Sequence, residues 1–542
     1  MKRALLILAL IAVVGVPFLL RPKRVAVADA DETVVIVTPH NEAIRYEYAR
    51  GFAAWYKGKT GKTVAIDWRV LGGTSEIARF LESEYITAFQ NYWTNRLHRR
   101  WSTEIQAGSQ NGRLPSDAPA AVREAREVFL ASDVGCGIDV FFGGGTYDFA
   151  KQAAAGRFVD SGIRRLHPGW FSDDVIPLQY AGEEYRDKED RWIGSVLSSY
   201  GIIYNRDALR RLGFSEPPKQ WQDLTSPRYF GEVALCDPTK SGSIAKAFEN
   251  VIQQQMQRRL RLIEAGHPAE EGKAVEARAV REGWEAGLKL LQLVGANARY
   301  FTDTSQKPPI DVAAGNCAAG MCIDFYGRTQ VESAQRRDGS GRLGYVTPVG
   351  GTVSSVDPVA LLRGAKNRDA AVAFIDYLLS MDGQKLWNFR IGAPGGPERY
   401  ALRRMPVRRD YYAHEDWRGL RSDPEADPYN QEDPLTYREA WTGGIFREMA
   451  FIIRVMCQDT HGELTEAWRA INRPEVTAAN REAALAVLQD MTAVSYDRTV
   501  TEVKRALGSK DKVDEIRFAN DLADLFRRQY RKAADIARGG KS

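Results

Sequence analysis

The chain has 542 residues, a formal net charge of +5 at pH 7 and an apolar content of 44%. Such a length allows two or three globular domains with ordinary hydrophobic cores. The small net charge and the lack of a dense basic block argue against a nucleic-acid-binding protein.

The N-terminus begins with a short basic segment and continues as an uncharged apolar run over residues 4–20. We assign residues 1–30 to a signal peptide or an N-terminal membrane anchor, with a buried helix as the third alternative. Cations follow the run at residues 21–24, which is unusual for a cleaved signal, yet small residues over 26–30 offer cleavage sites. Cleavage is left open. We expect a periplasmic or extracytoplasmic protein, either released or tethered to the inner membrane through residues 4–20.

Strand and helix patterns alternate after this leader. A β-branched run over residues 33–38 precedes one helical pattern, and an alternating run over 63–70 precedes another. Repeated strand–turn–helix units predict an α/β fold with a mainly parallel sheet. Ligands of such sheets bind beyond the carboxyl ends of the strands. Those ends carry histidine or hydroxyl side chains that are candidate ligand donors: His40, Thr74, Ser75, Thr146 and Ser199.

Residues 236–243, with the sequence CDPTKSGS, form the most informative turn. They follow a short apolar strand pattern and precede apolar residues at helical spacing. The free N–H groups and the positive dipole end of a helix start favour an anion. Thr239, Ser241, Gly242 and Ser243 are therefore candidate anion-binding residues. The alternative interpretation is a simple N-cap, because serine is a preferred capping residue.

Two segments depart from this pattern. Residues 85–133 are rich in Arg, Gln, Trp and Tyr and predict a helical insertion, and residues 401–542 predict a mostly helical C-terminal extension of unknown role. Five cysteines show no metal-site spacing. Cys317 and Cys322 are near enough in sequence to form a disulfide outside the cytoplasm, or they are small buried residues. No Ser-His-Asp order or pair of carboxylates converges on the strand ends, so an enzyme is not expected.

The order of the motifs resembles the type II periplasmic solute-binding proteins of ABC importers, in their ferric-iron-binding branch. The similar segments include residues 192–205 ("W.G…YN"), 218–232 ("P..W.DL…yfG") and 367–384 ("N…A..F…GQ"). The resemblance covers roughly residues 33–400 without the insertions. It implies two α/β lobes joined by crossover hinge strands, with the ligand between them. Lobe 1 would comprise residues 33–200 and 346–400, and lobe 2 residues 201–345.

In that branch a histidine, a glutamate and two adjacent tyrosines hold ferric iron, and a Ser-Gly-small turn holds a synergistic anion. His40 and Tyr326 stand at matching positions, but Phe325 replaces the first tyrosine and no carboxylate stands at the glutamate position. Asp324 is a further oxygen donor to consider. A hydrogen-bonding His40 and a packed Tyr326 are the alternatives to metal ligands.

The anion half of the implied site is complete, because residues 241–243 match the turn. We therefore expect a small anionic solute, or Fe(III) chelated by a synergistic anion, that is delivered to an ABC permease. The alternative is an exported sensor or scaffold of the same fold that signals to a membrane partner.

Overall fold

The computed structural model describes residues 30–266, 272–431, 433–509 and 511–540. The predicted leader lies outside this part except for residue 30, and so it stays a prediction. Among the described residues, no helix combines the length and the apolar character needed to cross a bilayer.

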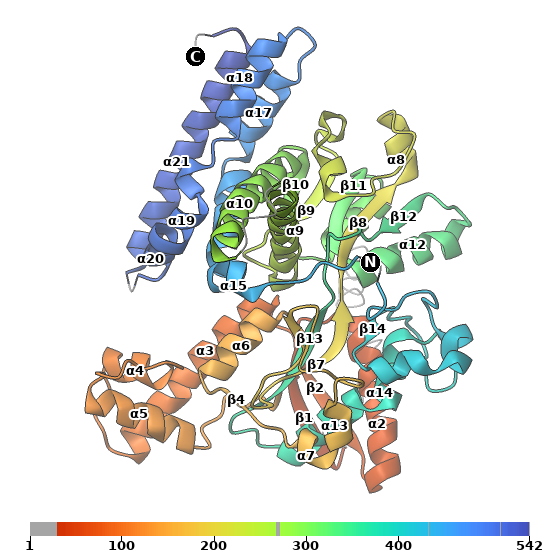
Figure 1. The fold of residues 1–542 in the computed structure, drawn as a ribbon. Helices are drawn as coiled ribbons and strands as arrows, with labels where there is room; N and C mark the ends of the chain where they lie inside the picture. Colours follow the sequence, from red (N-terminus) through yellow and green to blue (C-terminus); the bar gives the residue numbers. More distant parts are fainter. Residues whose placement is uncertain (1–29, 267–271, 432, 510, 541–542) are drawn as a thin grey trace, which may run out of the picture.

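The first of two main sheets forms the lower lobe in Figure 1. Its strand order is β14-β7-β13-β3-β1-β2, with β4 paired to β13. The three strands β1, β2 and β3 are parallel, whereas β13 runs antiparallel to β3, β4 and β7. The strands are β1 Glu32–Val37, β2 Val64–Arg69, β3 Val140–Phe142, β4 Phe158–Val159, β7 Ile193–Ser198, β13 Ser355–Leu362 and β14 Met405–Pro406.

The second sheet forms the upper lobe and has the order β10-β9-β11-β8-β12. Here β9 is parallel to β10 and β11, and β8 is antiparallel to β11 and β12. The strands are β8 Tyr200–Asn205, β9 Val233–Cys236, β10 Ala298–Thr302, β11 Ala319–Ile323 and β12 Leu343–Val346. A separate two-stranded hairpin, β5 Gln179–Tyr180 with β6 Glu183–Glu184, lies between these sheets in sequence.

The described chain crosses between the lobes at three places, the third of them between β14 and the helices from residue 439 onward, which pack on the second lobe. Ser199 joins β7 to β8, and residues 347–354 join β12 to β13. A later segment also returns to the first sheet, because β14 pairs with β7 beyond the predicted lobe boundary at residue 400. The sequence pattern did not reveal β14, since a strand of two residues carries no periodicity.

Most helices of the two lobes follow the end of a strand, although α10 follows α9 and α14 follows α13. Asn41 caps α2 by accepting a hydrogen bond from the Ile44 N–H, and Gly61 ends that helix in the left-handed region (φ 77°). The helices of the first lobe are α2 Glu42–Thr60, α3 Thr74–Asn91, α6 Thr146–Ala154, α7 Ile163–Leu166, α13 Arg368–Leu379 and α14 Met381–Asn388. Those of the second are α8 Arg206–Arg211, α9 Gly242–Gly266, α10 Lys273–Ala296, α11 Lys307–Ala313 and α12 Asp324–Asp338.

The segment from residue 92 to 131 projects from the first lobe (Figure 1) and contains a π-helical turn, Tyr92–Arg96, followed by α4 Thr103–Ser109 and α5 Ala120–Ala131. Its buried Trp93 and Phe129 pack against Phe89 near the end of α3. All five cysteines are free thiols, including Cys317 and Cys322, which are both buried.

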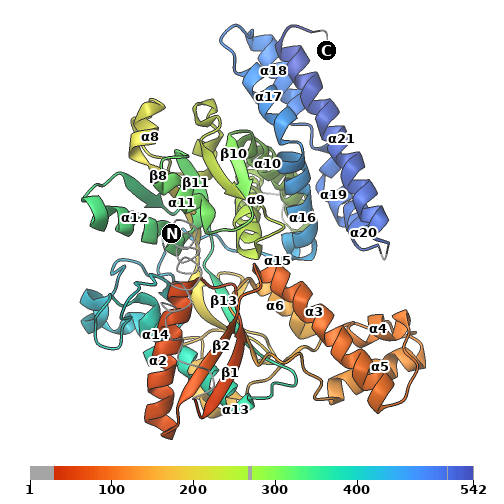
Figure 2. The same ribbon diagram turned by 180° about the vertical axis from the view of Figure 1, so that it is seen from behind.

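The C-terminal extension packs along α9 and α10 of the second lobe (Figure 2). Buried hydrogen bonds fix it there: Trp284 Nε1 donates to the Val494 carbonyl at 2.9 Å, and Gln292 Nε2 donates to the Leu488 carbonyl at 2.8 Å. The part of the extension from residue 439 onward therefore belongs structurally to the second lobe, whereas its first residues, including β14, lie on the first lobe. Its helices are α15 Glu439–Thr442, α16 Phe446–Ile453, α17 His461–Ile471, α18 Ala478–Leu488, α19 Tyr496–Arg498, α20 Lys504–Leu507 and α21 Lys512–Ala537.

Candidate functional site

The N-termini of α3, α6 and α9 meet at the boundary between the lobes. A Cβ atom at Gly73, just before α3, would lie 2.6 Å from the carbonyl oxygen of Lys240, just before α9. Gly144 precedes α6 with a φ of 125°, and a Cβ there would collide with the side chain of Thr74. The close approach of backbone requires glycine at position 73, and the positive φ together with the Thr74 side chain requires it at position 144. The boundary is thus a direct contact of three helix starts.

The turn before α9 is held by its own side chains. The Asp237 carboxylate accepts hydrogen bonds from the N–H and the hydroxyl of Thr239, both at 2.7 Å. Ser241 Oγ accepts a hydrogen bond from the Ile244 N–H at 3.3 Å, which makes Ser241 a cap of the helix. The Ser241 hydroxyl therefore acts as a helix cap, as the alternative interpretation predicted. Thr239, Gly242 and Ser243 of the same turn line two cavities.

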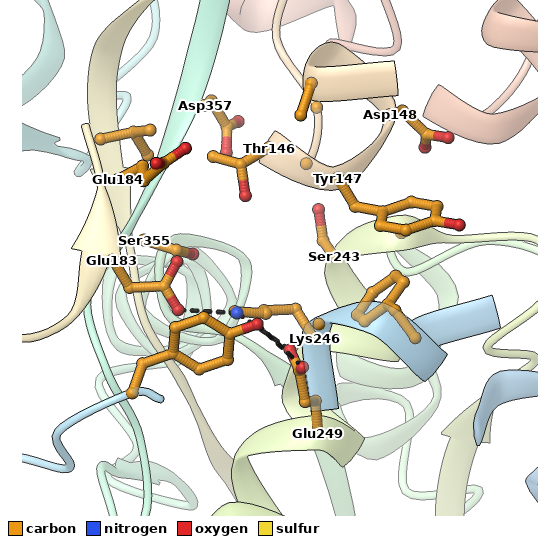
Figure 3. A pocket seen from close by; sticks show the side chains of 18 of the residues that line it. Thr146, Tyr147, Asp148, Glu183, Glu184, Ser243, Lys246, Glu249, Ser355 and Asp357 are labelled. Atoms are coloured by element: carbon orange, nitrogen blue, oxygen red, sulfur yellow. Dashed lines mark hydrogen bonds and ion pairs between the residues drawn. The ribbon is translucent and has the colours of Figure 1, made fainter. Parts of the chain in front are cut away.

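The first cavity, which we call the inner cavity, has a volume of about 110 Å³ and lies between α6, the β5–β6 hairpin, α9, β13 and the C-terminal extension. The predicted residues Thr146, Gly242 and Ser243 line it (Figure 3). Acidic side chains nevertheless outnumber basic ones in its wall, because Lys246 is the one lysine or arginine among its lining residues. Six carboxylic acids share its wall: Asp148, Glu183, Glu184, Glu249, Asp357 and Glu439.

Lys246 joins three parts of the chain in a buried ionic network (Figure 3). Its Nζ lies 2.7 Å from Glu183 Oε1 on β6 and 2.9 Å from Glu249 Oε2 on α9. It also lies 3.2 Å from the ring centroid of Tyr437 in the extension, whose hydroxyl donates to Glu249 at 3.0 Å. Burial alone would lower the pKa of Lys246, but the two glutamates raise it well above its ordinary value. The lysine is therefore a fixed internal cation.

The second cavity, the outer groove, is much larger, at about 970 Å³. It runs between α3 and α6 of the first lobe on one side and α16, α20 and α21 of the extension on the other, with the turn before α9 at its end. Ser75, Thr239 and Gly242 line it. Six cationic side chains face three acidic ones, Glu82, Asp148 and Glu515; the cations are Arg79, Lys151, Lys240, Arg447, Arg454 and Lys512.

A thin partition separates the two cavities. Tyr147, Asp148, Gly242 and Phe446 line both of them, and the rings of Tyr147 and Phe446 lie 4.8 Å apart across the lobe boundary. Ser75 Oγ donates a hydrogen bond to Asp148 at 3.1 Å. Burial raises the pKa of Asp148, and the Ser75 hydroxyl, Lys151 and Arg79 oppose that shift. The inner cavity is thus acidic and the outer groove basic across one layer of side chains.

His40 contacts an arginine that the sequence analysis did not single out. Its Nε2 lies 3.2 Å from Nη1 of Arg404 and 3.4 Å from Oδ2 of Asp357. Arg404 is fully buried, pairs with Asp357 at 2.7 Å, donates to Ser198 and covers the ring of Phe325 at 4.4 Å. Burial lowers the pKa of His40, so the imidazole is neutral at pH 7.

The charge of Arg404 also acts on Tyr326 and Asp324, where it opposes the rise in pKa that burial causes. Asp324 is the first residue of α12 and accepts a hydrogen bond from Ser199 Oγ at 3.2 Å. Burial raises its pKa, an effect that Arg328 and Arg404 only partly offset. Burial likewise raises the pKa of Tyr326, so its phenol stays protonated.

Of the residues predicted to hold ferric iron, His40 contacts the Arg404 guanidinium, and the charge of this guanidinium also acts on Tyr326 and Asp324. Ferric iron requires anionic oxygen donors, and a cation among the donors opposes it. Within the described residues, no three His, Cys, Asp or Glu side chains are grouped as metal ligands. These residues do not fit a ferric ion while Arg404 lies among them.

Two of the residues that dominate these sites escaped the sequence analysis. The sequence carries a weak indication of Lys246, because a lysine among the apolar residues of the first turns of α9 indicates a buried acidic partner. It carries none of Arg404, since this residue lies beyond the motifs and reaches Asp357 and His40 only through the return of the chain to the first lobe.

Two lobes joined by crossover segments, with a site where helix starts meet at their boundary, define a periplasmic binding protein fold. Residues 137–408 match the family of bacterial extracellular solute-binding proteins, and the chain belongs to this family. Its members bind solutes, in agreement with the prediction of a binding protein and not an enzyme.

Curated relatives match part of the chain. An uncharacterized protein of Haemophilus influenzae is 27% identical over 252 residues, which are 46% of this chain and 60% of that protein. The phosphoglycerate transport regulatory protein PgtC of Salmonella typhimurium is 26% identical over 196 residues, or 36% of this chain and 40% of PgtC. The match thus spans less than two thirds of either relative.

Two solved structures are also similar. AfuA of Actinobacillus pleuropneumoniae, with fructose-6-phosphate bound, has a TM-score of 0.47 at 16% identity and covers 81% of this chain and 98% of its own. Apo ferric ion-binding protein A of Pasteurella haemolytica has a TM-score of 0.44 at 14% identity and covers 78% and 97%.

Proposed function

We propose that this chain is an extracytoplasmic receptor for a small organic anion, with phosphate esters as the preferred class, which it binds in the outer groove. The observation that carries the proposal is the surplus of cationic side chains where the turn before α9 meets α3 and α6. The acidic inner cavity repels an anion, although Ser243 and Thr146 line it.

The anion is assigned to cationic side chains and not to hydroxyls. Ser75 and Thr239 already donate their hydroxyl protons to Asp148 and Asp237. Lys240 lies 4.0 Å from Glu76, a long and exposed pair, and within the described residues Arg79 and Lys151 make no ion pair within 4 Å. Charge-assisted hydrogen bonds from these three residues supply the affinity.

Two downstream roles follow from such binding. Delivery to an ABC permease is the role expected for the family, and residues 4–20 would direct the export that this role requires. Sensing is the second candidate, favoured by the C-terminal extension that lines the groove and by the name of PgtC as a transport regulatory protein. In either role the ligand is the same.

The proposal is tested by calorimetric titration of the full-length protein with 3-phosphoglycerate, glycerol 3-phosphate, inorganic phosphate and ferric citrate. We expect at least one phosphate ester to bind, and Lys240→Ala and Arg79→Ala each to weaken it about tenfold or more, as for a lost hydrogen bond to a charged group. The control is Lys219→Ala, an exposed lysine outside the groove.

Binding of ferric citrate alone, or phosphate-ester binding that ignores both groove substitutions, would contradict the assignment. Loss of binding in the Lys219→Ala control would show that the effect is general charge and not the groove.

A further inference from the structure

One whole wall of the outer groove comes from the C-terminal extension. Arg447, Arg454 and Lys512 line this wall, while Arg79 and Lys151 line the opposite wall on α3 and α6. The two walls belong to different lobes, because the extension is bound to the second lobe. The following inference rests on the proposed function.

The extension wall is held firmly. Gln253 Nε2 of α9 donates to Thr442 Oγ1 at 2.7 Å, just before α16, and the extension packs against α10 through Trp284 and Gln292. The Arg447 side chain donates to the Leu507 carbonyl at 3.0 Å, which ties α16 to α20. The cations of this wall therefore follow the second lobe in any opening of the boundary.

The extension wall carries more positive charge than its carboxylates neutralise. Arg447 and Lys512 share Glu515 at 2.9 and 3.0 Å, so two cations face a single carboxylate. Arg454 pairs with Asp459 at 3.3 Å. On the opposite wall and at the turn before α9, three cations, Arg79, Lys151 and Lys240, line the groove together with two acids, Glu82 and Asp148.

Two walls of like charge repel each other across the groove unless an anion lies between them. A single anionic group offsets one wall, whereas a ligand with two anionic groups offsets both. We propose that the outer groove takes a small solute with two anionic groups, one held by Arg79, Lys151 and Lys240 and the other by the arginines of the C-terminal extension. The extension is then part of the binding site, and occupancy draws the two lobes together.

Two probes with the same three-carbon skeleton test this. Glycerol 3-phosphate carries a phosphate only, whereas 3-phosphoglycerate adds a carboxylate. In calorimetric titrations of the full-length protein we expect 3-phosphoglycerate to bind at least tenfold more tightly. The double substitution Arg447→Gln with Arg454→Gln should reduce that preference to about twofold or less.

Glu515→Gln is the matched variant that should change the preference for 3-phosphoglycerate in the opposite direction. It removes the acid shared by Arg447 and Lys512 and should increase the preference for 3-phosphoglycerate by about threefold, which damage to the fold could not produce. An unchanged preference in both variants would overturn the role of the extension while leaving the anion receptor intact. If neither probe binds the wild-type protein, the proposed function fails, and this inference fails with it.

Discussion

The inner cavity and the outer groove lie back to back and share four lining residues, yet they carry opposite charge. The inner lysine is fully engaged by Glu183 and Glu249, as the high cost of an unpaired buried charge requires. The outer cations exceed their acidic partners and stay in contact with solvent. The charges inside the boundary thus hold the chain together, while the surplus of positive charge outside it can hold a ligand.

Replacing the internal cation should show the largest effect. Lys246→Met leaves Glu183 and Glu249 buried without a cationic partner, and we expect it to lower the free energy of unfolding by about 3–5 kcal/mol. Urea unfolding followed by circular dichroism measures the change. The triple variant with Glu183→Gln and Glu249→Gln should recover part of the loss. A single variant as stable as the wild type would show that the inner network is not structural.

A substitution at the contact between the lobes should have the second-largest effect. A Cβ at Gly73 would meet the Lys240 carbonyl at 2.6 Å, so Gly73→Ala should disfavour the closed boundary by about 1–3 kcal/mol. Small-angle X-ray scattering should give a larger radius of gyration for the variant. Gly58→Ala in α2 is the control, because no atom lies within 4 Å of its added methyl group. Equal radii for the two variants would argue against a tight boundary.

The smallest predicted effect is a difference in pH dependence between the two regions. Burial and then Glu439 raise the pKa of Glu184 in the inner cavity above 4.5. A raised carboxyl pKa favours folding at low pH, and that contribution is lost as the pH rises through the folded-state pKa. Glu184→Gln should therefore stabilise the protein at pH 7, and the gain should vanish toward pH 4.

Glu515 in the outer groove behaves in the opposite way. Burial alone would raise its pKa, but Lys512 and Arg447 lower it below 4.5. Its contribution is thus present above pH 4.5 and lost as the pH falls through the folded-state pKa. Glu515→Gln should cost up to about 1 kcal/mol at pH 7 and nothing in strong acid. Unfolding curves from pH 3 to 8 compare the two variants, and parallel pH profiles would remove the distinction.

Local patterns in the sequence predicted much of the fold. The β-branched run that became β1 and the apolar spacing that became α9 depend on neighbours in the chain, and so do the polar strand ends. Pairings between strands far apart in the sequence, such as that of Met405–Pro406 with β7, could not be predicted from local patterns. The two-residue β14 has no pattern of its own, and only the folded sheet gives it a partner.

The sequence predicted the turn before α9 as a candidate site, but it did not predict the charges that surround this turn. The turn before α9 does lie at the lobe boundary, as its place between a strand and a helix indicated. The acidity of the inner cavity depends on Glu183 from a hairpin and Glu439 from the extension, which come together only in three dimensions. The same holds for Arg447 in the groove. Sequence spacing cannot report charges contributed by separate segments.

Arg404 has a consequence for how the protein depends on its surroundings. A receptor that takes its positive charge from solution is complete only when the supply of that ion allows it. Here the charge opposite Asp357 is covalently part of the chain, present once in every molecule and at every external concentration. The Arg404, Asp357 and His40 cluster therefore does not depend on the concentration of a dissolved cation. The occupancy of the outer groove does depend on the concentration of its ligand.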